Sequence, residues 1–121
     1  MSDLSPLPKL EDVKSIFQRP RYINLLKLQL VKDLFVLTQE VNIIEECTSL
    51  ECLYDSLIHL FNQHISSNSK GVMNLLYRAD VSEHHIKQAL KSNPEKSSEV
   101  LAALILRREA QKILLREKYS R

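Results

Sequence analysis

Apolar residues recur at steps of three and four along most of this chain, the spacing that places them on one face of an α-helix. The longest such series lies within residues 21–46 and comprises Ile23, Leu26, Leu30, Leu34, Leu37, Val41 and Ile44. A second apolar stripe on the opposite side of the same segment comprises Leu25, Leu28, Val36 and Ile43. A helix that is apolar on two sides packs between neighbours or between subunits, so this segment is predicted to be the central helix.

The pattern predicts further helices on both sides of this segment. They cover, in chain order, residues 9–18, about 49–65, 72–79, 83–92 and about 94–119. Residues 1–8 hold two prolines in a polar context and are predicted to be a flexible N-terminal arm, which leaves residues 9–121 as one domain. The sequence therefore predicts an all-α single domain, a bundle of about five to six helices.

Capping residues support these helix starts. Thr48 begins "TSLE", a capping-box pattern in which the Thr hydroxyl and the Glu51 carboxylate each satisfy a backbone amide. Asn93 is a predicted cap, and Pro94 occupies the first helical position, where its missing N–H costs no hydrogen bond. The single glycine of the chain also favours helices, since tight turns between strands usually need several.

Composition and charge narrow the class of protein. The 121 residues are 44% hydrophobic and 26% charged, which argues against a disordered chain and against a membrane protein. Residues 33–69 hold six acidic residues and no Lys or Arg, whereas residues 107–121 hold six basic residues and two acidic ones. These two segments are expected to attract each other, within one molecule or between two copies.

The cysteines and the N-terminal residues bear on location. Only Cys47 and Cys52 occur, and they are interpreted as reduced thiols because nothing suggests a disulfide framework. The first residues lack the basic and apolar regions of a signal peptide. Charged residues interrupt the most apolar segment, so no membrane partner is expected. We therefore expect a soluble, cytoplasmic protein.

No pattern of catalytic or metal-binding residues emerges. His59 and His64 are five residues apart, whereas a helical zinc-binding pair needs a spacing of about four. A chain with one glycine cannot form a phosphate-binding loop or a dinucleotide-binding motif. The acidic residues at positions 45–55 are interpreted as helix-terminal acids that the helix dipole stabilises. The sequence predicts no enzyme, no metal and no cofactor.

The segment "LLYRADVSEHHIKQAL", residues 75–90, resembles the helix-turn-helix of bacterial DNA-binding regulators. Asp80 would take the left-handed turn position that usually holds glycine, and Ser82 would cap the second helix. Leu76 departs from the motif, which has a small residue there. The resemblance implies a DNA contact made by His85, Lys87 and Gln88.

A basic stripe at steps of four lies on the last helix and comprises Arg108, Lys112 and Arg116. In the DNA-binding alternative these three side chains would contact phosphates. We favour the interpretation that they complement the helix dipole and the acidic middle of the chain. The last helix is therefore predicted to complete the folded domain rather than to bind a membrane or nucleic acid.

Two stretches, "NLLYRADVSE" and "LILRREAQKILLR", resemble the C-terminal half of a small family of helical Bacteroidetes proteins of unassigned activity. The resemblance implies a short bacterial cytoplasmic protein and transfers no functional residue. The function predicted from the sequence is a non-enzymatic protein–protein interaction or structural module, a homodimer or a partner of another protein. The residues predicted for self-association are Ile23, Leu26, Leu30, Leu34, Leu37 and Val41. A DNA-binding regulator is the alternative.

Overall fold

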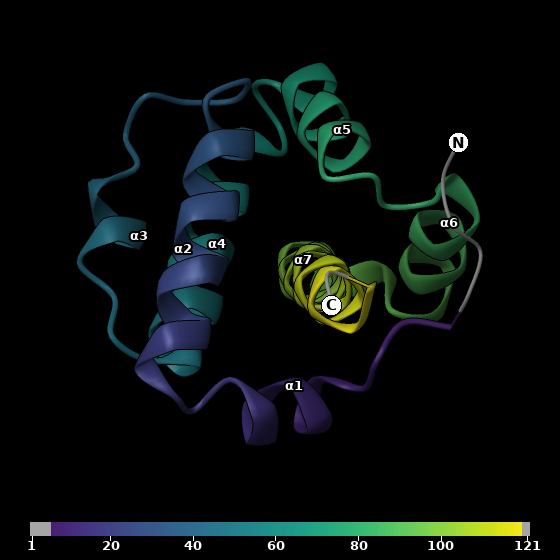
Figure 1. Ribbon diagram of the computed structural model, residues 1–121. Helices are drawn as coiled ribbons and strands as arrows, with labels where there is room; N and C mark the ends of the chain where they lie inside the picture. The colour runs from purple at the N-terminus through teal and green to yellow at the C-terminus, as the bar shows by residue number, and fades with distance from the viewer. Residues whose placement is uncertain (1–5, 120–121) are drawn as a thin grey trace.

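The computed structural model describes residues 6–119, which form seven α-helices and one 3₁₀ turn and contain no strand (Figure 1). The elements are α1 (Leu10–Ile16), α2 (Pro20–Leu34), α3 (Asn42–Glu45), α4 (Leu50–His64), α5 (Ser69–Arg78), α6 (Glu83–Ser92), η1 (Pro94–Lys96) and α7 (Ser97–Tyr119). The all-α prediction is confirmed. Within this range no helix is both long and apolar enough to cross a membrane.

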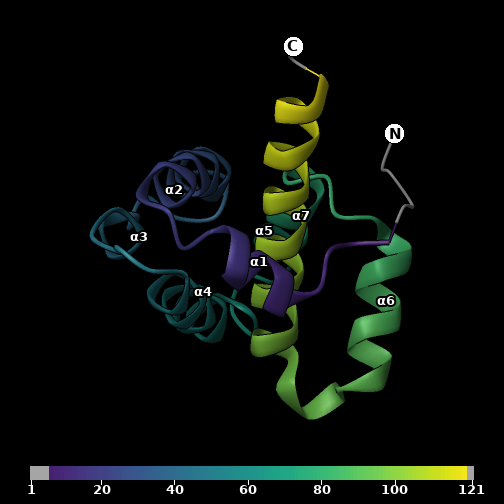
Figure 2. The ribbon, with the colours of Figure 1, turned by 60° about the horizontal axis from the view of Figure 1, so that its bottom comes forward.

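The central helix is α7 and not the segment 21–46. Figure 1 shows α7 end-on with α1, α2, α4, α5 and α6 around it, and it contacts α1, α2, α4 and α6. Its buried apolar residues are spread over most of its circumference and comprise Leu101, Ala102, Leu104, Ile105, Leu106, Ala110 and Ile113. A helix buried on so many sides needs neighbours all round it. In Figure 2 α7 passes between α2 and α4 on one side and α6 on the other.

The predicted helix over residues 21–46 divides into two helices. α2 ends at Leu34, and α3 begins only at Asn42. Between them the Thr38 hydroxyl accepts a hydrogen bond from the Glu40 amide, 3.0 Å away, so this side chain competes with helical hydrogen bonding. The apolar spacing continues across the break, because Leu37 lies three residues after Leu34 and is buried although it is outside both helices. Spacing alone therefore cannot show that the backbone leaves the helix.

Hydrogen-bonded caps decide where α4, α5 and α6 begin. Ser49, and not the predicted Thr48, caps α4 by accepting from the Cys52 amide. Asn68 caps α5 by accepting from the Gly71 amide, so α5 begins three residues before the predicted start at residue 72. Ser82 caps α6, and α6 has the predicted bounds of 83–92.

The described residues before α1 lie against α7, although they were predicted to belong to a flexible arm. Leu7 is buried, and the carbonyl of Pro8 accepts from Arg107 Nε at 2.8 Å. The carbonyl of Pro6 accepts from Gln111 Nε2 at 3.3 Å. The rest of the predicted arm, residues 1–5, lies outside the described part of the chain.

The two cysteines form a disulfide, which corrects their interpretation as reduced thiols. Cys47 follows α3 and Cys52 lies in the first turn of α4, so the bend between these helices brings the two residues together, with 5.5 Å between their Cα atoms. Disulfides persist mainly in oxidising compartments. The cysteines therefore do not support the predicted cytoplasmic location.

Candidate interaction surface on α2

The apolar residues predicted for self-association lie inside the folded chain. Their exposed fractions range from 0% to 8%, and the set comprises Ile23, Leu26, Leu30, Leu34, Leu37 and Val41. Side chains at this depth belong to the core of one molecule and cannot contact a second copy without unfolding. The site predicted from this stripe is therefore corrected.

Two residues of the second apolar stripe, Leu28 and Val36, face solvent, whereas Leu25 and Ile43 are partly buried. Leu28 is 69% exposed, and Phe35 and Val36, which follow the end of α2, are 56% and 43% exposed. Leu25 and Val31 flank Leu28 on the helix and are partly buried. We call Leu25, Leu28, Val31 and Phe35 the outer face of α2. Three of the five large apolar side chains most exposed in residues 6–119 belong to this one region.

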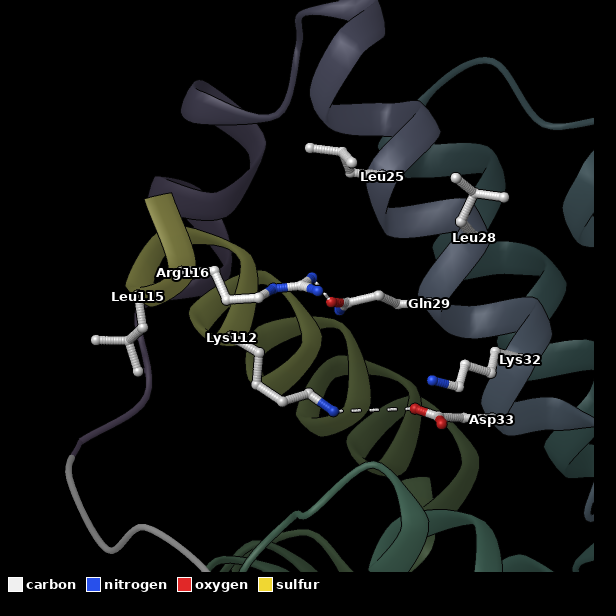
Figure 3. A pocket seen from close by; sticks show the side chains of 8 residues that line it. All are labelled: Leu25, Leu28, Gln29, Lys32, Asp33, Lys112, Leu115 and Arg116. Carbon is white, nitrogen blue, oxygen red and sulfur yellow. Dashed lines mark hydrogen bonds and ion pairs between the residues drawn. The ribbon is translucent and has the colours of Figure 1, made fainter. Parts of the chain in front are cut away.

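A groove of about 570 Å³ separates the outer face of α2 from the end of α7 (Figure 3). It is lined by Leu25, Leu28, Gln29, Lys32, Asp33, Lys112, Leu115 and Arg116. Figure 3 shows Arg116 directed toward Gln29, to which it is hydrogen-bonded, and Lys112 directed toward Asp33. We call this the α2–α7 groove; its lining is mainly apolar, and its charged residues are three bases, Lys32, Lys112 and Arg116, and one acid, Asp33.

A second groove of about 360 Å³ lies on the other side of Leu28 and is lined by Asn24, Lys27, Leu28, Val31 and Glu45. We call it the α2–α3 groove. Leu28 lines both grooves, so it forms a ridge between them. An exposed apolar ridge with a groove on each side is a shape that a facing helix can pack against.

Buried charges lie beneath the α2–α7 groove. Asp33 forms ion pairs with Arg78 at 3.5 Å and with Lys112 at 3.9 Å, which links α2 to α5 and α7. Glu109 is fully buried beside them; its Oε1 pairs with Lys112, and its Oε2 has no hydrogen-bond partner among residues 6–119. Burial raises the pKa of Glu109 to about 8; Asp33 adds to the shift, because its carboxylate can accept a hydrogen bond only from the protonated form of Glu109, and Lys112 opposes it.

The basic stripe on α7 is engaged within the fold. Arg108 is 6% exposed and donates from Nε to the Asp80 carbonyl at 3.0 Å and from Nη2 to the Asp80 carboxylate at 2.8 Å. Lys112 pairs with Asp33 and Glu109. The buried Arg108 guanidinium cannot reach a phosphate, which corrects that part of the DNA-binding alternative. The interpretation that the stripe complements the acidic middle agrees with the Lys112–Asp33 pair.

The turn between α5 and α6 has the backbone that the helix-turn-helix resemblance implies. Asp80 has a φ of 63°, the left-handed conformation predicted for it. The remaining predicted DNA contacts, His85, Lys87 and Gln88, lie on α6, which both Figure 1 and Figure 2 place across α7 from α2. The predicted base contacts and the Lys112 and Arg116 side chains that face α2 therefore do not share one surface.

This turn gives a prediction that separates backbone from side-chain effects. Asp80→Ala and Asp80→Gly both remove the ion pair with Arg108, but only glycine tolerates a φ of 63° without a steric cost. We expect Asp80→Ala to be less stable than Asp80→Gly by about 1 kcal/mol in urea unfolding. Equal stabilities would show that the left-handed backbone at Asp80 carries no cost.

Comparisons with family models, with curated proteins and with solved structures found no match. The family resemblance therefore stays a prediction. The described residues also bring together no group of three or more His, Cys, Asp or Glu side chains that could hold a metal ion. The outer face of α2 and its two grooves remain the candidate functional site.

The sequence pattern indicated only part of this surface. Leu25 and Leu28 belong to the second apolar stripe, Val31 and Phe35 belong to neither stripe, and self-association was predicted for the other stripe. A usable signal was present, since Asn24 and Lys32 lie close to Leu28 on the helical circumference and mark the solvent side. Glu109 carried no signal, because an acid beside Lys112 on a basic helix resembles an ordinary surface pair.

Proposed function

We propose that this chain is a non-enzymatic protein–protein interaction module that self-associates through the outer face of α2. The observation that carries the proposal is Leu28, which stands 69% exposed on a ridge between two grooves. Burying one large apolar side chain stabilises an association by roughly 1.5–3 kcal/mol, and Phe35 and Val36 add to the same region. Apolar residues gathered in this way mark interaction surfaces rather than ordinary solvent-facing helices.

The charges support a protein partner over nucleic acid. Duplex binding draws its affinity from several exposed Lys and Arg side chains that contact phosphates together. Here Arg108 of α7 is buried against the α5–α6 turn, where it pairs with Asp80, and Lys112 pairs with two carboxylates. Lys87 on α6 lies 3.9 Å from Glu83, which reduces the positive charge of that helix.

The experiment compares two exposed positions on different helices. Leu28→Glu places a charge on the ridge, whereas Tyr77→Glu changes a 51% exposed aromatic residue on α5, outside the outer face. Both side chains are exposed, so both variants should fold, which circular dichroism checks. On a size-exclusion column with light scattering, we expect Leu28→Glu to have the mass of one 14.0 kDa chain. We expect the wild type and Tyr77→Glu to approach twice that mass.

Either of two results would contradict the proposal. A Leu28→Glu variant that keeps a dimeric mass would show that the contact lies on another surface. A Tyr77→Glu variant that dissociates as completely as Leu28→Glu would show that added charge, and not the ridge, controls association.

A further inference from the structure

The outer face of α2 carries opposite exposed charges on its two sides. On the side of α7, Lys32 and Arg116 are exposed and line the α2–α7 groove. On the side of α3, Glu45 and Glu46 are exposed, and neither forms an ion pair within residues 6–119. Lys27 is the one cation that lines the α2–α3 groove. The surface is therefore self-complementary in sign, with an apolar ridge between a basic and an acidic side.

The ridge has the spacing of a helix–helix seam. Asn24, Leu28, Val31 and Phe35 follow one another at steps of four, three and four, which is the spacing that keeps a stripe facing a partner helix. Asn24 precedes Leu28 by four residues and so takes a d position of this spacing, where its amide can hydrogen-bond to a facing amide. Two α2 helices that pack in parallel would bring Asn24 opposite its own equivalent.

The position of α2 between α3 and α7 decides which two-fold arrangement is favourable. Figures 1 and 2 both show α3 on one side of α2 and α7 on the other. A two-fold axis parallel to α2 exchanges these sides, so α3 of each copy comes over the α2–α7 groove of the other. A two-fold axis across α2 would instead bring α3 over α3, with carboxylates facing carboxylates, which is unfavourable.

Resting on the proposed function, we propose that two copies pair through parallel α2 helices, with Glu45 and Glu46 of each copy facing Lys32 and Arg116 of the other. Leu28 and Phe35 then meet their own equivalents along the seam. The contact is closed, because each copy contributes both the acidic side and the basic side. It predicts a dimer and no larger assembly.

The test uses reciprocal charge reversals. The first variant carries Lys32→Glu and Arg116→Glu, and the second carries Glu45→Lys and Glu46→Lys. In the proposed arrangement each variant alone brings like charges together on both sides of the ridge. In an equimolar mixture the two variants pair with each other, and opposite charges face each other again on both sides of the ridge. We therefore expect the dissociation constant of each variant alone to rise at least about tenfold, and that of the mixture to return to near the wild-type value.

A matched control reverses two exposed bases on α6, with Lys87→Glu and Lys91→Glu, which changes net charge as the first variant does. We expect this control to dimerise like the wild type. The measurement is mass by light scattering for each variant and for the mixture, at low and high salt. High salt should weaken the rescue, because exposed charges are screened.

The outcomes separate this inference from the proposed function. If both charge variants dimerise like the wild type while Leu28→Glu does not, the parallel arrangement is overturned and the outer face remains the contact. The arrangement is also overturned if each variant alone is monomeric and the mixture does not recover. If Leu28→Glu dimerises like the wild type, the proposed function fails and this inference fails with it.

Discussion

Raising the pH from about 5 to about 9 is expected to lower the free energy of unfolding by several kcal/mol, and Glu109→Gln is expected to remove most of that loss. The pKa of Glu109 is about 8 in the folded chain, against an ordinary value of 4.5. Between these two values the folded state holds a proton that the unfolded state has released. The stabilisation is therefore complete below about pH 4.5 and is lost as the pH rises through about 8.

The groups that face Glu109 explain the direction of this effect. Asp33 on α2 is a carboxylate, and a protonated Glu109 can donate a hydrogen bond to it. Lys112 on α7 favours the charged form of Glu109, and Arg78 on α5 pairs with Asp33. Burial outweighs these cations, because a fully buried carboxylate loses its hydration. A neutral Gln at position 109 keeps a donor for Asp33 at every pH.

Denaturant unfolding at about pH 5 and about pH 9 measures this difference, with each pKa unit corresponding to about 1.4 kcal/mol. The matched control is Glu99→Gln, which changes an exposed glutamate on the same helix and should leave the wild-type pH dependence intact. A Glu109→Gln variant that loses as much stability as the wild type between these pH values would contradict the assignment to Glu109.

Arg108→Met is expected to lower the free energy of unfolding by about 2–4 kcal/mol. Methionine keeps much of the apolar stem but leaves the carbonyl and the carboxylate of Asp80 without their guanidinium donors. Because the Arg108 side chain is only 7% exposed, water cannot fully replace those hydrogen bonds. The Asp80 side chain is 39% exposed, which keeps the expected loss below that of a fully buried pair.

A comparison within the same stripe tests this explanation. Arg116→Met changes an exposed arginine, and we expect it to cost less than about 1 kcal/mol in the same unfolding measurement. In addition, Arg108→Met should cost less in an Asp80→Gly background, where the ion pair is already absent. Equal costs in the two backgrounds would show that Arg108 stabilises the fold through contacts other than the Asp80 carboxylate, such as its hydrogen bond to the backbone carbonyl of residue 80.

Local signals in the sequence predicted the elements that local chemistry controls. The bounds of α6 and the left-handed backbone at Asp80 follow from a cap and a short polar side chain, both visible in the sequence. The break between α2 and α3 was missed, because Leu37 and Val41 preserve a helical spacing across a turn. The disulfide was missed because the bend between α3 and α4, which brings Cys47 and Cys52 together, leaves no signal in the spacing of the two cysteines.

Tertiary packing decided what the sequence left open at the candidate site. A segment with two apolar stripes can bury either one, and only the positions of its neighbours fix the choice. Because α7 is the central helix, the stripe that contains Leu26 turns inward and Leu28 is left outside. The same packing encloses Glu109 and brings it to Asp33, a residue 76 positions earlier in the chain by the difference between their numbers.

If two copies of this chain associate through the outer face of α2, sedimentation equilibrium of the unmodified chain will detect the dimer between low and high micromolar concentration. We expect a mass that rises with concentration toward twice 14.0 kDa and goes no higher. A mass that stays at 14.0 kDa over the whole range would contradict it.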